Sequence, residues 1–468
     1  MPHATGKMRL LPLVAATYFM VAGGPYGLED ILGDAGYGRA LLLLLIVPLL
    51  WSLPTALMVG ELASALPEEG GYYVWVRRAL GSFWGFQEAW LSLAASVFDM
   101  AIYPTIFVLY LSRLAPALTA GPRAILWELA VILLCTLWNL RGAKSVGEGS
   151  VAMMSLLLAP FVVLVATWNI LFAHADPTAS PTLAARLTHS FALLRMPIAA
   201  PSFAGAVSVA LWNYMGWDNA STIAQEVEDP QRNYPRAMLL AAALVALTYI
   251  VPLLAVGLAG MNPAQFTTGA WTDAARFIAG PGLFGSALVL AVVVGGMLNG
   301  GGMFNALMLS YARVPYALAQ DGLLPRFLTR TTRASPTRAP VPWASIVVCA
   351  IAWALALQLS FERLISIDLV LYGASLLLEF VALAVLRVRE PALPRPFRIP
   401  GGLAAAIAAG LGPAGLIVFA LVAARTERVG SLPALAFAAI IAALGPLAWL
   451  LARLSTPRTQ ARSSSQST

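Results

Sequence analysis

The stretch Trp212-Asn213-Tyr214-Met215-Gly216-Trp217-Asp218-Asn219 interrupts an otherwise apolar segment, residues 203–223, that is long enough to cross a lipid bilayer. A carboxylate near the bilayer centre costs about 2.5–3.5 kcal/mol on insertion scales, so a residue such as Asp218 usually faces a cavity and has a function there. Gly216 weakens the helix around it, and an interrupted helix exposes backbone groups that can bind a ligand. The stretch therefore predicts one half of a transport site.

A second interrupted segment lies near the N-terminus. Apolar sequence from Leu10 onward reaches Gly23-Gly24-Pro25-Tyr26-Gly27, followed by Leu28-Glu29-Asp30. Three glycines and a proline within five residues cannot continue a regular helix. Interrupted helices at matching positions of two halves point to the binding site of a secondary transporter. Close helix packing is the alternative explanation of the glycines, but it does not explain the acidic residues beside them.

The composition is typical of an integral membrane protein with many spans. Hydrophobic residues make up 59% of the 468 residues and charged residues 11%, and apolar runs of about 20 residues recur along the chain. The twelve predicted spans cover residues 10–34, 39–66, 82–112, 124–140, 150–173, 203–226, 236–260, 282–320, 342–360, 364–387, 403–424 and 432–454. The interruptions fall in spans 1 and 6. Because an odd number of spans turns the second unit over, spans 1–5 and 6–10 are predicted to form an inverted repeat, with two helices appended.

The predicted organisation follows from these spans. It comprises a cytoplasmic N-terminus at 1–9, a first five-span repeat at 10–175, a second, inverted repeat at 200–390, spans 11 and 12 at 400–454, and a disordered cytoplasmic tail at 455–468. With both termini inside, 20 of the 29 Lys and Arg residues lie on the cytoplasmic side and 9 on the outer side, which is the asymmetry expected of membrane proteins. The net charge of +7 has the same origin, so it does not indicate nucleic-acid binding.

Several stretches resemble the amino acid–polyamine–organocation transporter superfamily, and within it the polyamine-uptake branch of the L-type amino acid transporter group, known from plants and protists. They are residues 23–30 in span 1, the loop Pro67-Glu68-Glu69-Gly70-Gly71-Tyr72-Tyr73-Val74-Trp75-Val76, the span 3 stretches Gly85-Phe86-Gln87-Glu88-Ala89-Trp90 and Val97-Phe98-Asp99-Met100-Ala101-Ile102-Tyr103-Pro104, and residues 212–219 with Glu226-Val227-Glu228-Asp229-Pro230 after them. The resemblance implies an all-α, LeuT-like fold. One departure is that span 5 contains no Lys, whereas some proton-coupled members carry one there.

Three acidic residues, Glu29, Asp99 and Asp218, are predicted to meet in a central cavity. Asp99 lies deep in span 3, and Tyr103 follows it one turn later on the same helix face. The middle of these spans contains no Lys or Arg, so the carboxylates must pair with a cationic ligand or be protonated when the site is empty. The predicted substrate-binding residues are Gly23, Gly24, Tyr26, Glu29, Asp99, Tyr103, Trp212, Asn213, Trp217 and Asp218, and the predicted proton-binding residues are Glu29, Asp99 and Asp218.

Alternatives remain open for the buried acids. Asp99 is also consistent with helix packing, and Asp218 with hydrogen bonding to backbone amides freed at the interruption. Three further acids in predicted spans, Glu61, Glu88 and Glu379, suit either a bond between helices or a proton relay.

The sequence therefore predicts a secondary active transporter in the plasma or inner membrane that imports polyamines such as putrescine or spermidine by proton symport with alternating access. Aromatic rings around the site would bind the ammonium groups and methylene stems. The alternative is an amino-acid permease on the same fold, which would hold a carboxylate and an amine at the helix ends without three acids. We expect no cofactor, metal site or enzymatic activity, because the sequence has no metal-ligand cluster, nucleophile motif or phosphate-binding loop.

Overall fold

The computed structural model describes residues 6–173, 201–333, 339–357, 361–423, 425, 428–429 and 431–455, so nearly all of the predicted disordered tail lies outside the described residues. The first half of the chain forms helices α1 (Leu10–Val21), α2 (Glu29–Val47), the π-helical turn η1 (Pro48–Ser52), α3 (Leu53–Ala65), α4 (Tyr72–Leu80), α5 (Ser82–Leu114), α6 (Pro116–Thr119), α7 (Arg123–Asn139) and α8 (Ala143–Ala173).

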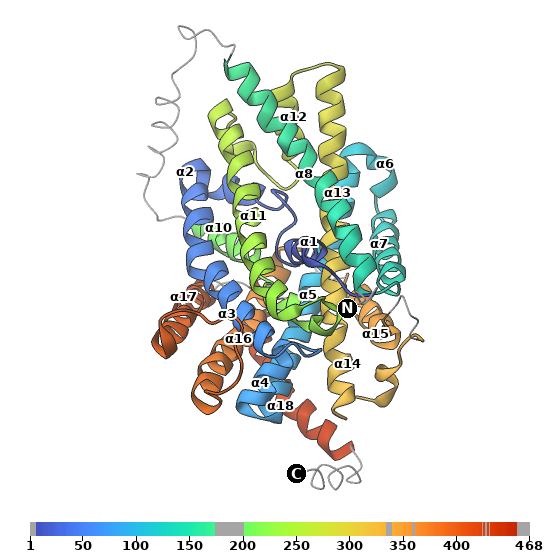
Figure 1. The fold of residues 1–468 in the computed structure, drawn as a ribbon. Coiled ribbons are helices and arrows are strands. Elements are labelled where there is room, and N and C mark those ends of the chain that lie inside the picture. The colour runs from blue at the N-terminus through green and yellow to red at the C-terminus, as the bar shows by residue number, and fades with distance from the viewer. Residues whose placement is uncertain are drawn as a thin grey trace.

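The second half is helical too, with one short hairpin. It forms α10 (Pro201–Trp212), η3 (Asp218–Thr222), η4 (Ala224–Glu226), α11 (Pro230–Ala259), η5 (Pro263–Gln265), α12 (Trp271–Ala279), α13 (Leu283–Tyr311), α14 (Arg313–Gln320), η6 (Arg326–Thr329), α15 (Trp343–Ala356), α16 (Phe361–Arg389), α17 (Gly402–Ala423), β1 (Arg428–Val429), β2 (Leu432–Pro433) and α18 (Ala434–Ser455). The long helices pack side by side into one bundle (Figure 1). The all-helical prediction is confirmed.

Every stretch predicted as a span contains a helix. Within the described part of the chain, eight helical segments are long and apolar enough to cross a membrane, by length and composition. They are Glu29–Ala65, Ser82–Leu114, Ala143–Ile170, Pro230–Ala259, Leu283–Gln320, Ile367–Arg389, Gly402–Ala423 and Ala434–Leu454. Three shorter apolar helices, Leu10–Val21, Phe203–Trp212 and Trp343–Ala356, add to these. Twelve crossings therefore stay a prediction.

Both predicted interruptions are present. Helix α1 ends at Val21, and the chain resumes as α2 at Glu29; helix α10 ends at Trp212. The backbone of Gly216 has φ of 91°, and a Cβ atom placed there would lie 2.2 Å from the Met20 carbonyl oxygen. Because only glycine tolerates that φ and that approach, Gly216 lets the two interruptions touch.

The boundary between predicted spans 1 and 2 coincides with a sharp bend. The gap between residues 10–34 and 39–66 falls inside α2, which consists of two helical pieces joined at Gly36. At Gly36, φ of 70° and ψ of 170° are not helical. Glycine has no Cβ to clash in this conformation, so the chain can turn here between the two helical pieces.

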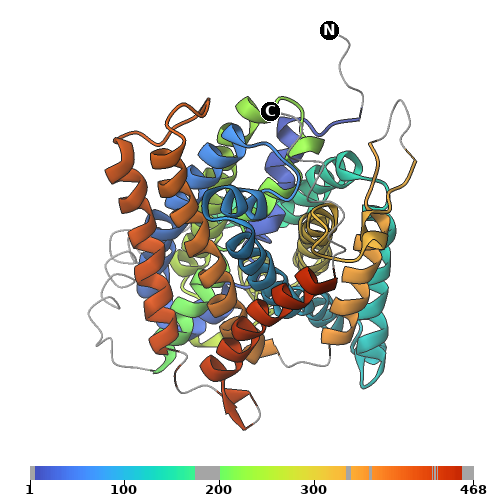
Figure 2. The same ribbon diagram turned by 90° about the horizontal axis from the view of Figure 1, so that it is seen from below.

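Helix α5 is the central helix of the bundle. It packs against α13 on one side and α16 on another, and also against α4 and α18. Figure 2, which looks along the bundle from below, shows α5 near the middle and the orange helix α17 at the periphery. Side chains that α5 directs toward α13 or α16 are therefore far from the outer surface.

Candidate functional site

A small cavity lies where the two interruptions touch. It is lined by residues from α1, α5, α10, the stretch after α10, α13 and α16. These residues are Met20, Val21, Asp99, Tyr103, Trp212, Met215, Gly216, Asn219, Tyr311 and Tyr372. The lining contains a single carboxylate and no Lys or Arg.

Asp99 is the acidic residue of this cavity. Its Oδ1 accepts hydrogen bonds from the Tyr103 hydroxyl at 2.5 Å and from Trp212 Nε1 at 3.3 Å, and its Oδ2 accepts one from the Tyr311 hydroxyl at 3.5 Å. The rings of Tyr103 and Trp212 are stacked, with centroids 6.1 Å apart and an angle of 21° between them. Asp99 is only 5% exposed. The cavity therefore presents a buried negative charge between aromatic faces, which is a favourable setting for an ammonium group.

Asp218 lies behind the cavity wall. Its carboxylate accepts a hydrogen bond from the Tyr372 hydroxyl, and the same hydroxyl accepts one from the Gly216 amide at 2.9 Å. Tyr372 lines the cavity, whereas Asp218 does not. At Gly216, the freed backbone amide is thus satisfied by a tyrosine, and Asp218 reaches the cavity through that tyrosine.

The structure does not bring Glu29 into the cavity with Asp99. The Glu29 carboxylate accepts hydrogen bonds from the Tyr110 hydroxyl and from the backbone amides of Gly27 and Gly269, at 2.6 and 3.1 Å for the amides. Tyr110 follows Asp99 by eleven residues on α5, a rise of about 16 Å. As the first residue of α2, Glu29 also complements the positive end of that helix. It forms a separate buried site.

The other predicted binding residues hold the two interruptions in place without lining the cavity. A Cβ at Gly23 would overlap the Asn299 side chain, and Gly24 has φ of 76°. Tyr26 donates to the Val292 carbonyl at 2.8 Å, and Asn213 to the Gly27 carbonyl at 3.2 Å. Trp217 is fully buried.

Three residues near Asp99 were missed by the sequence analysis. Tyr311 and Tyr372 line the cavity, and Asp368 lies one helical turn before Tyr372. Asp368 is 1% exposed, neither of its carboxylate oxygens has a hydrogen-bond partner, and its charge interacts with that of Asp99. The sequence does contain a signal for Asp368, because it is a carboxylate within the apolar run of span 10. The cost of burying such a group, which pointed to Asp218, points to Asp368 as well.

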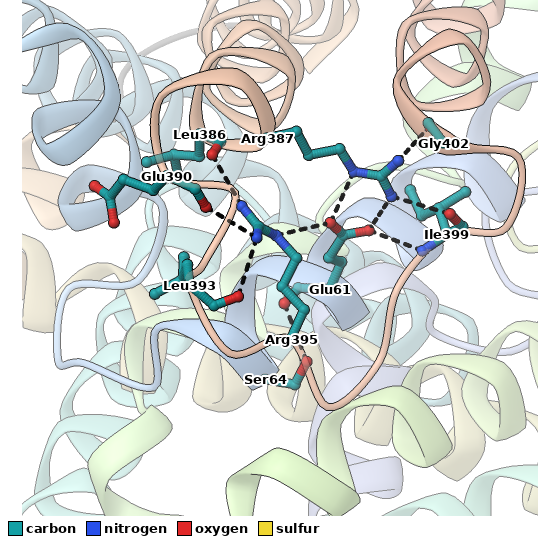
Figure 3. Close-up of polar contacts among 9 residues, drawn as sticks. All are labelled: Glu61, Ser64, Leu386, Arg387, Glu390, Leu393, Arg395, Ile399 and Gly402. Atoms are coloured by element: carbon teal, nitrogen blue, oxygen red, sulfur yellow. Dashed lines mark hydrogen bonds and ion pairs between the residues drawn. The ribbon is translucent and has the colours of Figure 1, made fainter.

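Glu61 has a different environment. Its carboxylate pairs with Arg387 and with Arg395, whose Nε lies 3.4 Å away, and accepts a hydrogen bond from the Ile399 amide at 2.8 Å (Figure 3). Arg387 donates further to the carbonyls of Ile399 and Gly402. This network, in which the side chains of Glu61 and Arg387 are buried, ties α3 to the end of α16, to the segment before α17 and to the first residue of α17. Of the two roles left open for Glu61, the structure favours the bond between helices.

Comparison with known proteins gives the family. Residues 14–444 match the model of a family described as amino acid permease. The chain belongs to this family of permeases. The resemblance to the amino acid–polyamine–organocation superfamily is thereby confirmed, and the permease is a multi-pass membrane protein whose named relatives are transporters.

Three relatives illustrate the range of sequence identity and of named substrates. The permease is 33% identical to a probable polyamine transporter of Arabidopsis thaliana, over 92% of this chain and 82% of the relative. It is 33% identical to a polyamine transporter of Oryza sativa subsp. japonica, over 90% of this chain and 75% of the relative. A serine/threonine exchanger of Bacillus subtilis is more distant, at 24% over 75% of each chain.

Proposed function

We propose that this permease imports polyamines across the cell membrane by alternating access, coupled to the entry of protons. The observation that carries the proposal is the Asp99 carboxylate, buried in the cavity beside the stacked rings of Tyr103 and Trp212 and without a basic residue in the lining. Since an isolated buried charge is costly, a cationic ligand stabilises this site most. The relatives named as polyamine transporters support the same substrate class.

Within this proposal, the predicted site residues have distinct roles. Asp99, Tyr103 and Trp212 contact one ammonium group and the methylene carbons beside it. Asp218 attracts a further ammonium group through its contact with Tyr372, and Glu29 is a separate acidic position about three helical turns from Asp99 along α5. The remaining residues, Gly23, Gly24, Tyr26, Asn213 and Trp217, position the interruptions. Glu29, Asp99 and Asp218 are the proposed proton-exchanging acids around the substrate.

The proposed architecture keeps twelve crossings, the inverted repeat of 10–175 and 200–390, and both termini in the cytoplasm. It is supported by the two interrupted helices α1 and α10, which lie five predicted spans apart. The asymmetry of basic residues supports the orientation.

We expect a cysteine tag placed after Thr468 to be inaccessible to an impermeant reagent added outside intact cells. Efficient labelling from outside would reverse the orientation.

Uptake into proteoliposomes tests the function. We expect radiolabelled putrescine or spermidine to accumulate when an inward proton gradient is imposed, and replacement of sodium by choline to have no effect. The reason is that unpaired carboxylates in a membrane must gain or lose charge as the site empties. Unlabelled arginine and leucine should compete poorly. A strict sodium requirement would exclude the coupling, and absence of polyamine uptake would exclude the substrate class.

An amino-acid permease is the second candidate. The family description and the serine/threonine exchanger favour it, and the ends of α1 and α10 beside the cavity could hold a carboxylate and an amine. The same competition assay separates the two: if leucine or arginine displaces the polyamine efficiently, the amino-acid function is the better assignment.

A further inference from the structure

A stripe of buried polar residues runs along the contact between α5 and α16. On α16, Asp368, Tyr372, Ser375 and Glu379 are spaced four, three and four residues apart, which places them on one face of the helix. The facing side of α5 carries Glu88 eleven residues before Asp99. Asp99 and Tyr372 line the cavity at one end of this stripe, and Glu88 and Glu379 form the other end.

At the Glu88–Glu379 end, a hydrogen bond joins α5 to α16. Ser375 donates to Glu88 Oε1 at 2.7 Å, and Glu379 follows Ser375 by one helical turn. The charges of Glu88, Glu379 and Asp218 interact with one another. Asp218 in turn accepts the hydrogen bond of Tyr372. Along α16, Ser375 and Tyr372 thus lie between Glu379 and the cavity.

Three carboxylate oxygens of the pair have no partner. Both Glu379 oxygens and Glu88 Oε2 are buried without a hydrogen bond, and both residues are 0% exposed. In the part of the chain that the structure describes, no Lys or Arg lies within ion-pair distance of either acid. Two neighbouring buried carboxylates without a basic partner cannot both be ionised at acceptable cost.

The described elements named below supply no charge that neutralises the pair. Helix α4 contributes Tyr72, which accepts a hydrogen bond from Ser92, while its Arg77 and Arg78 pair with Asp321 and Glu390. The Arg387 end of α16 is bound to Glu61 of α3. Asp218 of η3 adds a further negative charge. The described residues of α10 and α17 include no charged side chain, and Arg453 of α18 lies over the Trp449 ring.

We infer that Glu88 and Glu379 form a proton-binding site on the α5–α16 contact, about 16 Å along α5 from Asp99. A proton needs no cavity, only carboxylate oxygens that are otherwise unpaired, and these two acids supply three. Binding converts one carboxylate of the pair to a neutral carboxyl group, and release leaves two negative charges in one buried contact. The proton therefore controls how firmly α5, which carries Asp99, packs against α16, which carries Tyr372.

That the Glu88–Glu379 site couples proton entry to polyamine uptake rests on the proposed function. The test therefore has two readouts. The first is infrared titration of the purified, substrate-free permease, following the stretching band of protonated carboxyl groups. Exposed glutamates lose their protons near pH 4.3, so we expect a component that persists at about pH 7 in the native protein. That component should be smaller in the double variant Glu88→Gln/Glu379→Gln, to which Asp368 and the other buried acids still contribute, and unchanged in the control Glu128→Gln, which alters a partly buried acid of α7.

The second readout is putrescine uptake into proteoliposomes. We expect an imposed proton gradient to drive accumulation by the native protein and by Glu128→Gln. In the double variant, accumulation with the proton gradient should equal accumulation without it, a ratio of about one. Exchange of labelled for unlabelled putrescine should continue. A merely structural role would reduce exchange and accumulation together. The inference is overturned if the double variant shows an infrared component, or a gradient-driven accumulation, as large as that of the native protein.

The two hypotheses can fail separately. If the native protein moves no polyamine, the proposed function fails and the infrared titration alone decides whether the proton site exists. If the native protein accumulates putrescine and the double variant does so equally well, the inference fails and the function stands. Should the double variant not fold, Glu379→Gln alone is measured in the same way, because Glu379 makes no side-chain hydrogen bond that the substitution would remove.

Discussion

Replacing Asp99 by Asn is expected to raise the apparent Michaelis constant for putrescine or spermidine by a factor of roughly 30 or more. Truncating one partner of a buried charge pair typically costs about 2–5 kcal/mol, and 1.4 kcal/mol corresponds to a factor of ten. The substitution conserves volume, and the amide can still accept the hydrogen bonds from Tyr103 and Trp212. Uptake kinetics in proteoliposomes, with protein content normalised, measure the effect.

The matched control is Asp273→Asn. Asp273 lies on α12 with a side chain that is 60% exposed, and its contact with Arg113 is long, at 3.8 Å. We expect this variant to transport like the native protein. If Asp99→Asn is as active as the control, Asp99 does not bind the substrate cation, and the amino-acid permease becomes the better assignment.

Replacing Glu61 by Gln is expected to destabilise the folded protein by about 3–5 kcal/mol, because the substitution leaves two arginines without their common carboxylate in a buried site. Arg387 is 1% exposed at its side chain, so water cannot replace the lost partner. Thermal unfolding of the purified protein in detergent, or the yield of monodisperse protein, measures the loss.

Glu390→Gln provides the comparison for this second substitution. Glu390 also pairs with an arginine, Arg78, but both side chains are about one-third exposed. Hydrogen bonds from Arg78 hold the pKa of Glu390 below its usual range. Exposed pairs contribute about 0–1 kcal/mol, so the midpoint of unfolding should change little. Equal stability of the two variants would show that the Glu61 network does not hold α3 to α16.

The sequence predicted the interruptions well because their cause is local. Glycines and a proline at residues 23–27, and Gly216 in the second stretch, end helices by their own backbone properties. Asp99 and Tyr103 were predicted to act together for a similar reason, since one helical turn separates them and the structure joins them by a hydrogen bond. Both predictions needed information from only one segment.

The errors concern contacts between segments. The prediction put Glu29 in the same cavity as Asp99 because both are acids in predicted spans near the interruptions. The hydrogen-bond partners of Glu29, Tyr110 and Gly269, come from elements far away in the sequence. Tyr372 was overlooked because α16 is uninterrupted, and nothing local marks the turn that faces the cavity. The separate environments of Glu61 and Glu379 likewise depend on which helices lie opposite them.

The Tyr372 hydroxyl serves two buried partners at once, donating to Asp218 and accepting from the Gly216 amide. Any displacement of α16 that withdraws this hydroxyl leaves both partners unpaired together. An unsatisfied buried polar group costs about 1–3 kcal/mol, so losing both partners costs more than losing either contact alone. The position of α16 and the conformation of the chain at Gly216 and Asp218 are therefore energetically coupled through a single hydroxyl group.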